Sequence, residues 1–305
     1  MNLAKKALLS IFWNSIGNYL GFLAGFLGQL FLIRLLVPED FGVFALVSSV
    51  YEILSIFTAW CFSVAIIQMP EEEGLVDTAF ILSVVQGLII IIIGSIISIC
   101  LGFYYPSQKV LPVIFFVLGL ARALILIAYV YSAILEKKLE FKKLSIARTF
   151  TNISSVLITI MVAIYGFGVW SLVIRELLSG VISIIAFKQI SHWKFGWKYS
   201  TVLAKRLIAF GNKMLVSRGL EAAFYRLDNF IVGIVGGITV LGYYSQARYL
   251  VDAVNAATIP AASSVALPVY SSVQNEESKL KEAYRIGNYF LIRILIPISL
   301  ILSPD

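Results

Sequence analysis

Long apolar runs without a charged residue dominate the chain. Three of them cover residues 7–33, 78–108 and 149–174. Each exceeds the roughly 20 apolar residues with which an α-helix crosses the hydrocarbon core of a membrane. None of the apolar segments shows the alternation, about ten residues long, that is typical of barrel strands. The pattern therefore predicts an all-α polytopic membrane protein.

Proline- and glycine-containing segments separate the apolar runs and set the boundaries of the predicted helices. We place nine transmembrane spans, at residues 8–33, 41–69, 79–104, 110–135, 149–165, 168–187, 214–237, 240–270 and 288–303. The division at Gly166–Gly168 is the least marked of the breaks, and one long helix over residues 149–174 is its alternative.

Composition excludes several classes of protein. The chain of 305 residues is 60% hydrophobic and 13% charged, with a mean hydropathy of +0.92, whereas soluble domains are about 45–50% apolar and about 25% charged. A soluble enzyme, a disordered tail and a disulfide scaffold are therefore excluded. Cys61 and Cys100 lie in apolar segments and are interpreted as core residues. The single histidine, His192, excludes most histidine-based metal sites, and we expect neither a metal nor a cofactor.

Basic residues indicate the orientation. If the N-terminus is cytoplasmic, only Arg34 and Lys109 fall in loops on the opposite side. The cytoplasmic side then receives Lys5, Lys6, Lys137, Lys138, Lys142, Lys143, Arg148, Lys188, Lys194, Lys198, Lys205, Arg206, Lys213, Lys279, Lys281 and Arg285. This asymmetry follows the positive-inside rule. The net charge of +7 is thus explained by the orientation of the spans in the membrane, and no nucleic-acid partner is expected. The first apolar run is about twice as long as the core of a typical signal peptide, so we expect it to remain as a span.

Short sequence matches recur at an offset of about 200 residues. Phe41-Gly42-Val43-Phe44 is matched by Leu241-Gly242-Tyr243-Tyr244, Glu52 by Asp252, and Ser63–Ile66 by Ser264–Leu267. Six predicted spans separate the copies, so both have the same orientation. The repeat predicts two parallel six-helix lobes related by a pseudo-two-fold axis along the membrane normal.

This repeat defines the predicted domains. Residues 1–187 form the N-terminal lobe, and residues 188–213 form a cytoplasmic linker. The basic and aromatic segment 190–212 is interpreted as amphipathic and bound to the membrane surface. Residues 214–305 begin the C-terminal lobe, which we expect to be truncated because the sequence stops just after the ninth span.

Charged side chains inside spans are the strongest functional signal, because each costs about 2.5–3.5 kcal/mol at mid-membrane on insertion scales. They are Glu52, Arg122, Arg175, Glu176, Arg218, Glu221, Arg226, Asp228, Arg248, Asp252 and Arg293. Helical spacing places Tyr244, Arg248, Asp252 and Asn255 on one stripe. Arg122 has no acidic residue nearby in its own span.

Two interpretations of these charges remain open: internal ion pairs that hold helices together, or a hydrated cavity with excess arginine suited to an anionic head group. The candidate binding residues for such a cavity are Arg122, Arg218, Arg226, Arg248, Asn14, Asn18, Gln29 and Tyr244. The candidate ion-coupling residues are Glu52, Glu221, Asp228 and Asp252. On the first span, Gly17, Gly21, Gly25 and Gly28 form a strip suited to close helix contact. The sequence has no Gly-Lys-Ser/Thr phosphate loop and no Asp-x-Asp pair, so catalysis is not expected.

The segment Leu35–Ala45 resembles the first extracytoplasmic turn of bacterial polysaccharide-export flippases, in the MATE-like multidrug/oligosaccharidyl-lipid/polysaccharide exporter superfamily. Arg226–Gly233, followed by Leu241–Tyr244, is similar to the span-seven signature of that family. The resemblance implies more spans than the nine predicted. It also implies export of undecaprenyl-pyrophosphate-linked oligosaccharides across the inner membrane by alternating access, for lipopolysaccharide or a related surface polysaccharide.

The partners implied by the resemblance are the lipid-linked oligosaccharide, membrane lipid, and the polysaccharide polymerase with its chain-length machinery. Two alternatives stay open. A MATE-type drug/cation antiporter should have a cavity dominated by acids, whereas here arginines slightly outnumber them. A scaffold of a polysaccharide synthase complex that transports nothing is the other alternative.

Overall fold

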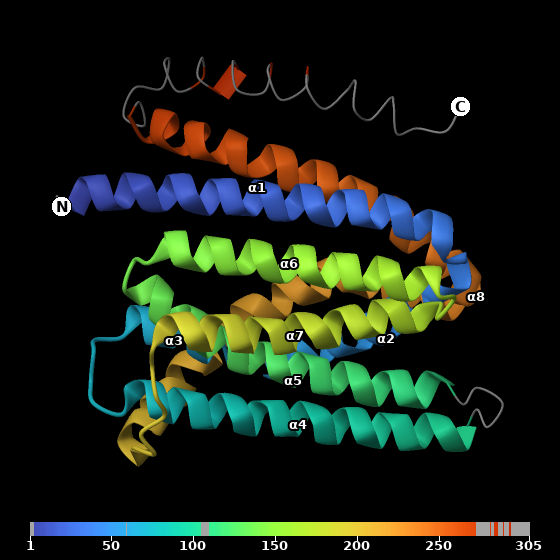
Figure 1. Cartoon of the computed structure of the whole chain (residues 1–305), viewed down its shortest axis with the longest axis horizontal. Helices are drawn as coiled ribbons and strands as arrows, with labels where there is room; N and C mark the ends of the chain where they lie inside the picture. Colours follow the sequence, from blue (N-terminus) through green and yellow to red (C-terminus); the bar gives the residue numbers. More distant parts are fainter. Residues whose placement is uncertain are drawn as a thin grey trace. The chain divides into compact units, whose positions relative to one another are not determined.

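The computed structural model describes residues 3–58, 60–104 and 110–272, and the single positions 281, 284, 285, 289 and 293. Within these residues every regular element is a helix (Figure 1). In chain order they are α1 (Leu3–Leu35), α2 (Pro38–Thr58), α3 (Phe62–Gln68), α4 (Leu75–Tyr104), α5 (Val110–Lys137), α6 (Phe141–Ile164), α7 (Val169–Ser191) and α8 (Thr201–Ser272).

Several of these helices are long and apolar enough to cross a membrane. Among the described residues the qualifying segments are Ser15–Leu35, Leu75–Cys100, Val110–Lys137, Phe141–Ile164, Val169–Ser191 and Leu227–Ala256. The predicted class, an all-α polytopic membrane protein, is confirmed. The count of nine spans stays a prediction, because residues 288–303 lie almost entirely outside the described residues.

Glycine breaks two helices where the sequence predicted it. Gly166 has φ 80° and Gly168 has φ 53°, so α6 ends at Ile164 and α7 begins at Val169. Gly237, with φ 80° and ψ 176°, interrupts α8 between the predicted seventh and eighth spans. A positive φ is adopted readily by glycine and at a steric cost by other residues. The helix leading into the seventh span starts at Thr201, earlier than the predicted residue 214, so much of the predicted linker is helical.

The predicted continuous helix over residues 41–69 is wrong in its interior. The chain leaves α2 after Thr58, and Cys61 adopts φ 48° before α3 begins. Contacts with other helices hold the chain at this break. The Gln86 amide donates to the Thr58 carbonyl, and Trp60 Nε1 donates to Asn212 Oδ1 at 2.9 Å. No glycine or proline marks this break, so only the tertiary contacts determine it.

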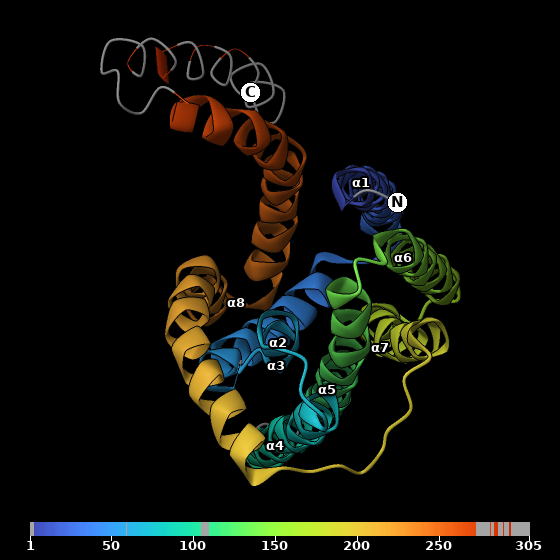
Figure 2. The same ribbon diagram turned by 90° about the vertical axis from the view of Figure 1, so that its left-hand side faces the viewer.

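The helices of the N-terminal unit pack in an order that differs from the sequence order. Helices α1, α6, α7, α5 and α4 follow one another as neighbours (Figure 1). Helix α2 contacts α4, α5 and α7, and the short helix α3 contacts α4 and α5 (Figure 2). By their contacts the residues form two compact units, Met1–Gln246 and Ala247–Asp305. The predicted division into lobes at residues 187 and 213 stays a prediction.

Tyr51 fixes α2 in the core of this unit. Its side chain is only 5% exposed and packs beside Phe115. Its hydroxyl donates to the Phe115 carbonyl. A Cβ atom on Gly94 of α4 or on Gly119 of α5 would collide with this hydroxyl. The two glycines therefore leave the space into which the tyrosine fits, and small residues allow three membrane helices to approach closely.

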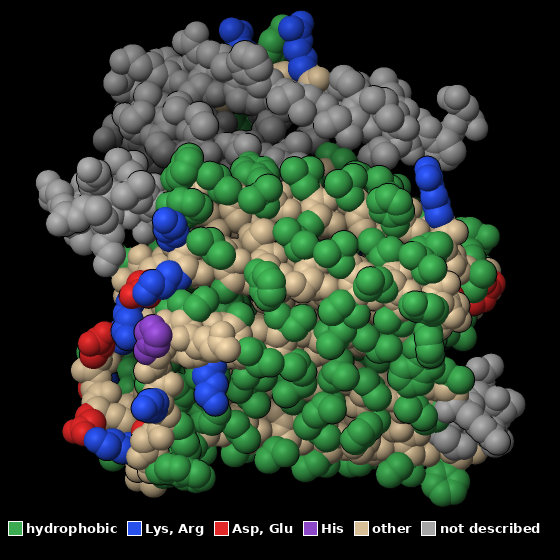
Figure 3. Space-filling model, viewed as in Figure 1, with side chains coloured by type: hydrophobic (Ala, Val, Ile, Leu, Met, Phe, Trp, Pro, Cys, Tyr) green, Lys and Arg blue, Asp and Glu red, His purple; other side chains and the backbone are tan. Residues whose placement is uncertain are grey.

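The surface has the polarity expected of a membrane protein. In Figure 3 hydrophobic side chains cover the face formed by α4 to α7, while most of the charged side chains and the histidine gather at one end. On α6, the large apolar residues Phe150, Leu157 and Met161 are each more than half exposed. A soluble monomer rarely exposes an apolar surface of this extent, whereas lipid covers it without cost.

Candidate functional site

Arg122 is an intramembrane charge with a buried nitrogen for which the described residues offer no hydrogen-bond acceptor. It lies in the middle of α5 and is partly buried. Its Nε is buried and has no hydrogen-bond partner among the described residues. A guanidinium remains protonated in any protein environment, and a buried charged donor without an acceptor is costly. An anionic oxygen from a ligand would satisfy it.

Helix α1 carries two of the predicted features on different faces. Gly17, Gly21 and Gly28 lie against α6, which confirms the predicted close contact for these three glycines. The Asn152 side chain reaches across this interface and donates to the Gly21 carbonyl at 2.8 Å. For the fourth glycine of the strip, Gly25, no atom of the described residues lies within 4 Å of the position of a Cβ.

The predicted polar face of α1 is partly engaged by the protein itself. Gln29 is 7% exposed, and its amide nitrogen donates to Gln246 Oε1 at 2.8 Å. This hydrogen bond joins α1 to α8, so the structure gives Gln29 a structural partner, and its binding role stays a prediction. Asn18 is exposed.

The structure brings together two residues that the sequence placed in different roles. The Tyr244 hydroxyl, a predicted binding group, donates to Asp228 Oδ2 at 2.7 Å. The backbone N–H of Asn229 donates to the other carboxylate oxygen of Asp228 at 2.8 Å. Glycine 237 lies between these residues in the chain, so the turn that it permits folds one half of α8 back toward the other.

Arg248 and Asp252 lie within the second unit, four residues apart on α8. Arg248 Nε is 3.7 Å from Asp252 Oδ2, and the Asp252 side chain is half exposed. A long, half-exposed pair of this kind contributes little to stability. Glu52 lies partly buried on α2. The side chains of the remaining candidates lie outside the described residues: Asn14, Arg218, Glu221 and Arg226.

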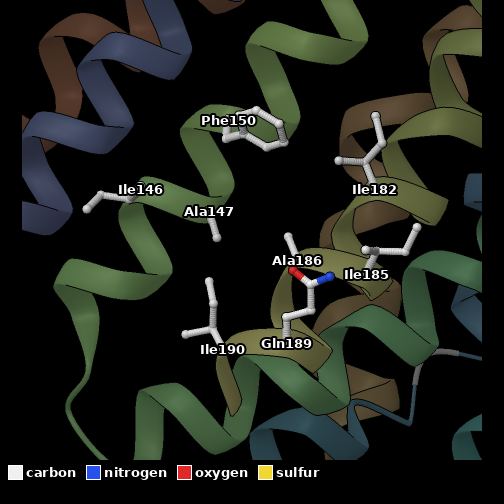
Figure 4. A pocket seen from close by; sticks show the side chains of 8 residues that line it. All are labelled: Ile146, Ala147, Phe150, Ile182, Ile185, Ala186, Gln189 and Ile190. Carbon is white, nitrogen blue, oxygen red and sulfur yellow. The ribbon is translucent and has the colours of Figure 1, made fainter. Parts of the chain in front are cut away.

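Two pockets flank the pair of helices α6 and α7. One is an apolar groove of about 460 Å³ between Phe150 on α6 and Ile182 and Ile185 on α7, with Gln189 as the one polar side chain (Figure 4). Such a lining suits lipid chains and offers little to a polar ligand. The other is a polar pocket of about 200 Å³ where α5, α6 and α7 meet.

The sequence did not identify the residues of this polar pocket. They are Tyr129, Ser132, Arg148, Thr151, Asn152, Ser179, Ser183 and Phe187. Serine and threonine in membrane helices commonly bond to carbonyls of their own helix and so carry no functional signal. The spacing of Ser179 and Ser183 places them on one face of α7, but only the packing of three helices makes a pocket of that face.

The two copies of the repeat meet at the end of the N-terminal unit where α2 begins. A Cβ on Gly42 would overlap the carbonyl of Ile238, and a Cβ on Gly242 would overlap the carbonyl of Pro38. These contacts are reciprocal, because an offset of 200 residues relates Gly42 to Gly242 and Pro38 to Ile238. Thr239 Oγ1 donates to Glu39 Oε1 at 2.9 Å, and these residues are themselves 200 apart. Equivalent segments that contact each other in this way are typical of a two-fold relationship.

At the opposite end, the linker after α7 is fastened to α4. Asp77 is 5% exposed and accepts backbone N–H bonds from Gly196 at 3.2 Å and from Lys198 at 3.0 Å. The Lys198 ammonium also bonds to Glu73, which lowers the pKa of the Glu73 carboxyl and raises the pKa of Lys198. Both groups are therefore charged at neutral pH. Trp197, 82% exposed, projects from this segment as an anchoring residue at a membrane interface would.

Known proteins similar to this chain take part in polysaccharide biosynthesis. The succinoglycan biosynthesis transport protein ExoT of Rhizobium meliloti (strain 1021) is 22% identical over 301 residues, which are 96% of this chain and 60% of ExoT. The teichuronic acid biosynthesis protein TuaB of Bacillus subtilis (strain 168) is 23% identical over 247 residues, 78% of this chain and 50% of TuaB. The lipopolysaccharide biosynthesis protein WzxC of Escherichia coli (strain K12) is 19% identical over 298 residues, 97% of this chain and 60% of WzxC.

The chain thus spans about half to three-fifths of the length of these curated relatives. No solved structure matches it. A family model described as polysaccharide biosynthesis protein matches residues 31–303. The resemblance to polysaccharide-export flippases is confirmed at the level of the family. Because this match covers most of the sequence, the chain belongs to the polysaccharide biosynthesis protein family.

Proposed function

We propose that the protein translocates lipid-linked oligosaccharides across the inner membrane for the assembly of a surface polysaccharide. The observation that carries the proposal is the buried Arg122 Nε, which has no hydrogen-bond partner among the described residues. The chain belongs to a family described by its role in polysaccharide biosynthesis. A lipid-linked oligosaccharide carries a phosphate or pyrophosphate between lipid and sugar. Arginine binds such groups through two parallel hydrogen bonds, so its place in mid-membrane suits a head group in transit.

The reciprocal contact around Gly42 and Gly242 supports transport by alternating access. It brings Gly42 against the Ile238 carbonyl and Gly242 against the Pro38 carbonyl. An interface in which the described residues make backbone contacts and the Thr239–Glu39 side-chain hydrogen bond can separate and reform as a unit. We infer that opening of this interface releases the substrate on the far side of the membrane.

The proposal is tested by deleting the chromosomal gene and following the lipid-linked oligosaccharide. We expect surface polysaccharide to be lost and the oligosaccharide to accumulate in the cytoplasmic leaflet, where a glycosidase added to intact spheroplasts cannot reach it. The unmodified gene should restore both. If the oligosaccharide reached the outer leaflet normally, the proposal would fail. A changed sensitivity to drugs alone would favour an antiporter, and loss of oligosaccharide synthesis itself would favour a scaffold.

The proposed orientation places the N-terminus in the cytoplasm, following the basic residues. In a protein whose two native cysteines are replaced by alanine, Tyr165→Cys should react with a membrane-impermeant maleimide in intact cells. Tyr165 is 81% exposed in the turn between α6 and α7. Lys142→Cys, exposed at the other end of α6, should react only after permeabilisation. The reverse pattern would invert the orientation.

A further inference from the structure

The polar pocket between α5, α6 and α7 has the properties of a binding site. It lies in the halves of these helices that are nearest to the end carrying Lys137, Phe141 and Ser191. Its lining includes Tyr129, Arg148, Thr151, Asn152, Ser179 and Ser183. Tyr129 follows Arg122 by seven residues, which is two helical turns, so both lie on the same face of α5. The pocket therefore opens on the side of α5 that carries the unsatisfied arginine.

Thr151 provides the evidence that this pocket suits a polar ligand. Its side chain is 4% exposed, and its hydroxyl is buried with no hydrogen-bond partner among the described residues. Threonine in a helix ordinarily bonds to a carbonyl of the preceding turn. Thr159 on the same helix does so, since its hydroxyl donates to the Ser155 carbonyl at 2.6 Å. Buried polar groups in native proteins are satisfied by protein, water or ligand, so the Thr151 hydroxyl requires a partner inside the pocket.

The charge balance of the pocket indicates a neutral polar ligand. Arg148 is compensated by Glu136, whose Oε1 lies 2.5 Å from its guanidinium. A bare anion would therefore meet little net positive charge. The hydroxyls of Thr151, Ser179 and Ser183 can each donate and accept hydrogen bonds to a ligand. The half-exposed ring of Tyr129 adds an amphipathic face on which an apolar edge can pack.

The volume limits the size of the ligand. The pocket has a volume of about 200 Å³. This space accommodates one ring that carries hydroxyl groups. We propose that the pocket binds a single sugar ring of the lipid-linked oligosaccharide, two helical turns from Arg122 toward the same end of the bundle. This inference rests on the proposed function, and it assigns a sugar subsite to side chains distinct from the candidate phosphate-binding arginine.

Binding to the purified full chain in lipid nanodiscs tests the inference. The probes are the free repeat-unit oligosaccharide, released from the host's own surface polysaccharide, and inorganic pyrophosphate, each followed by saturation-transfer NMR. We expect the double variant Thr151→Val/Ser183→Ala to bind the oligosaccharide about tenfold or more weakly, as for the loss of two hydrogen bonds. Its binding of pyrophosphate should not change.

Two control variants separate binding from folding. Thr159→Val removes a buried hydroxyl of the same helix that is satisfied internally, and should bind as the unmodified protein does. Thr151→Ser retains the hydroxyl and should retain binding. Unchanged oligosaccharide binding in the double variant would overturn the subsite, and so would a selective loss of pyrophosphate binding. If the unmodified protein bound neither probe, both the subsite and the proposed function would fail.

Discussion

Replacing Arg122 by alanine is expected to reduce polysaccharide export at least about tenfold while the amount of protein in the membrane stays near normal. A charge-assisted hydrogen bond contributes about 1.5–3 kcal/mol, and each 1.4 kcal/mol corresponds to a factor of about ten. Stability should suffer little, because the substitution removes a buried Nε donor that has no hydrogen-bond partner in the described part of the chain. The measurement is surface polysaccharide per unit of protein, with the variant introduced into the chromosomal gene.

Two further variants make the arginine result specific. Arg122→Lys retains the charge without the planar fork and should export at an intermediate level. Arg34→Ala removes an exposed arginine at the end of α1 and should export normally. Normal export by Arg122→Ala would contradict the binding role. If Glu52→Gln were inactive in the same experiment, the antiporter alternative would gain support.

Alanine at Gly42 or Gly242 is expected to destabilise the protein and to abolish most export. The added methyl group would overlap a backbone carbonyl, of Ile238 or Pro38 respectively, which cannot rotate away as a side chain can. Overpacking of this kind costs typically about 1–3 kcal/mol. The reciprocal interface should then fail to close, and the apparent Tm of the purified protein should fall.

Gly25 supplies the matched control for these substitutions. It lies within a helix as the other two glycines do, but no atom of the described part of the chain lies within 4 Å of its Cβ position. Gly25→Ala should therefore be neutral or stabilising by up to about 1 kcal/mol, because alanine is the better helix former. The expected change in stability thus has opposite signs for Gly25→Ala and for alanine at Gly42 or Gly242. Equal thermal stability of Gly25→Ala and Gly242→Ala would disprove the close contact as a source of stability.

The apolar runs and their breakers determine most of the described fold. A run of uncharged residues can satisfy its backbone inside a membrane only as a helix, and Gly166, Gly168 and Gly237 permit the backbone angles at which helices end or turn. The offset of 200 residues in the sequence also reappears, in the reciprocal contacts of Gly42 and Gly242. The spacing of residues along one helix also predicts the glycine strip on α1. It likewise predicts that Arg122 needs a partner outside its own helix, because no acidic residue lies nearby in that helix.

Contacts between helices distant in sequence determined the rest. The break after Thr58 depends on the hydrogen bonds of Gln86 to the Thr58 carbonyl and of Trp60 to Asn212, which no local sequence pattern predicts. Gln29, a predicted binding residue, donates a hydrogen bond to Gln246, a contact that the sequence did not predict. The polar pocket requires α5, α6 and α7 together, although each contributes only ordinary serines, threonines or a tyrosine. The sequence by itself therefore determined the helices and the location of costly charges, because both are properties of one segment in a membrane. Which polar groups are satisfied is a property of neighbouring helices, and only the tertiary structure decided it.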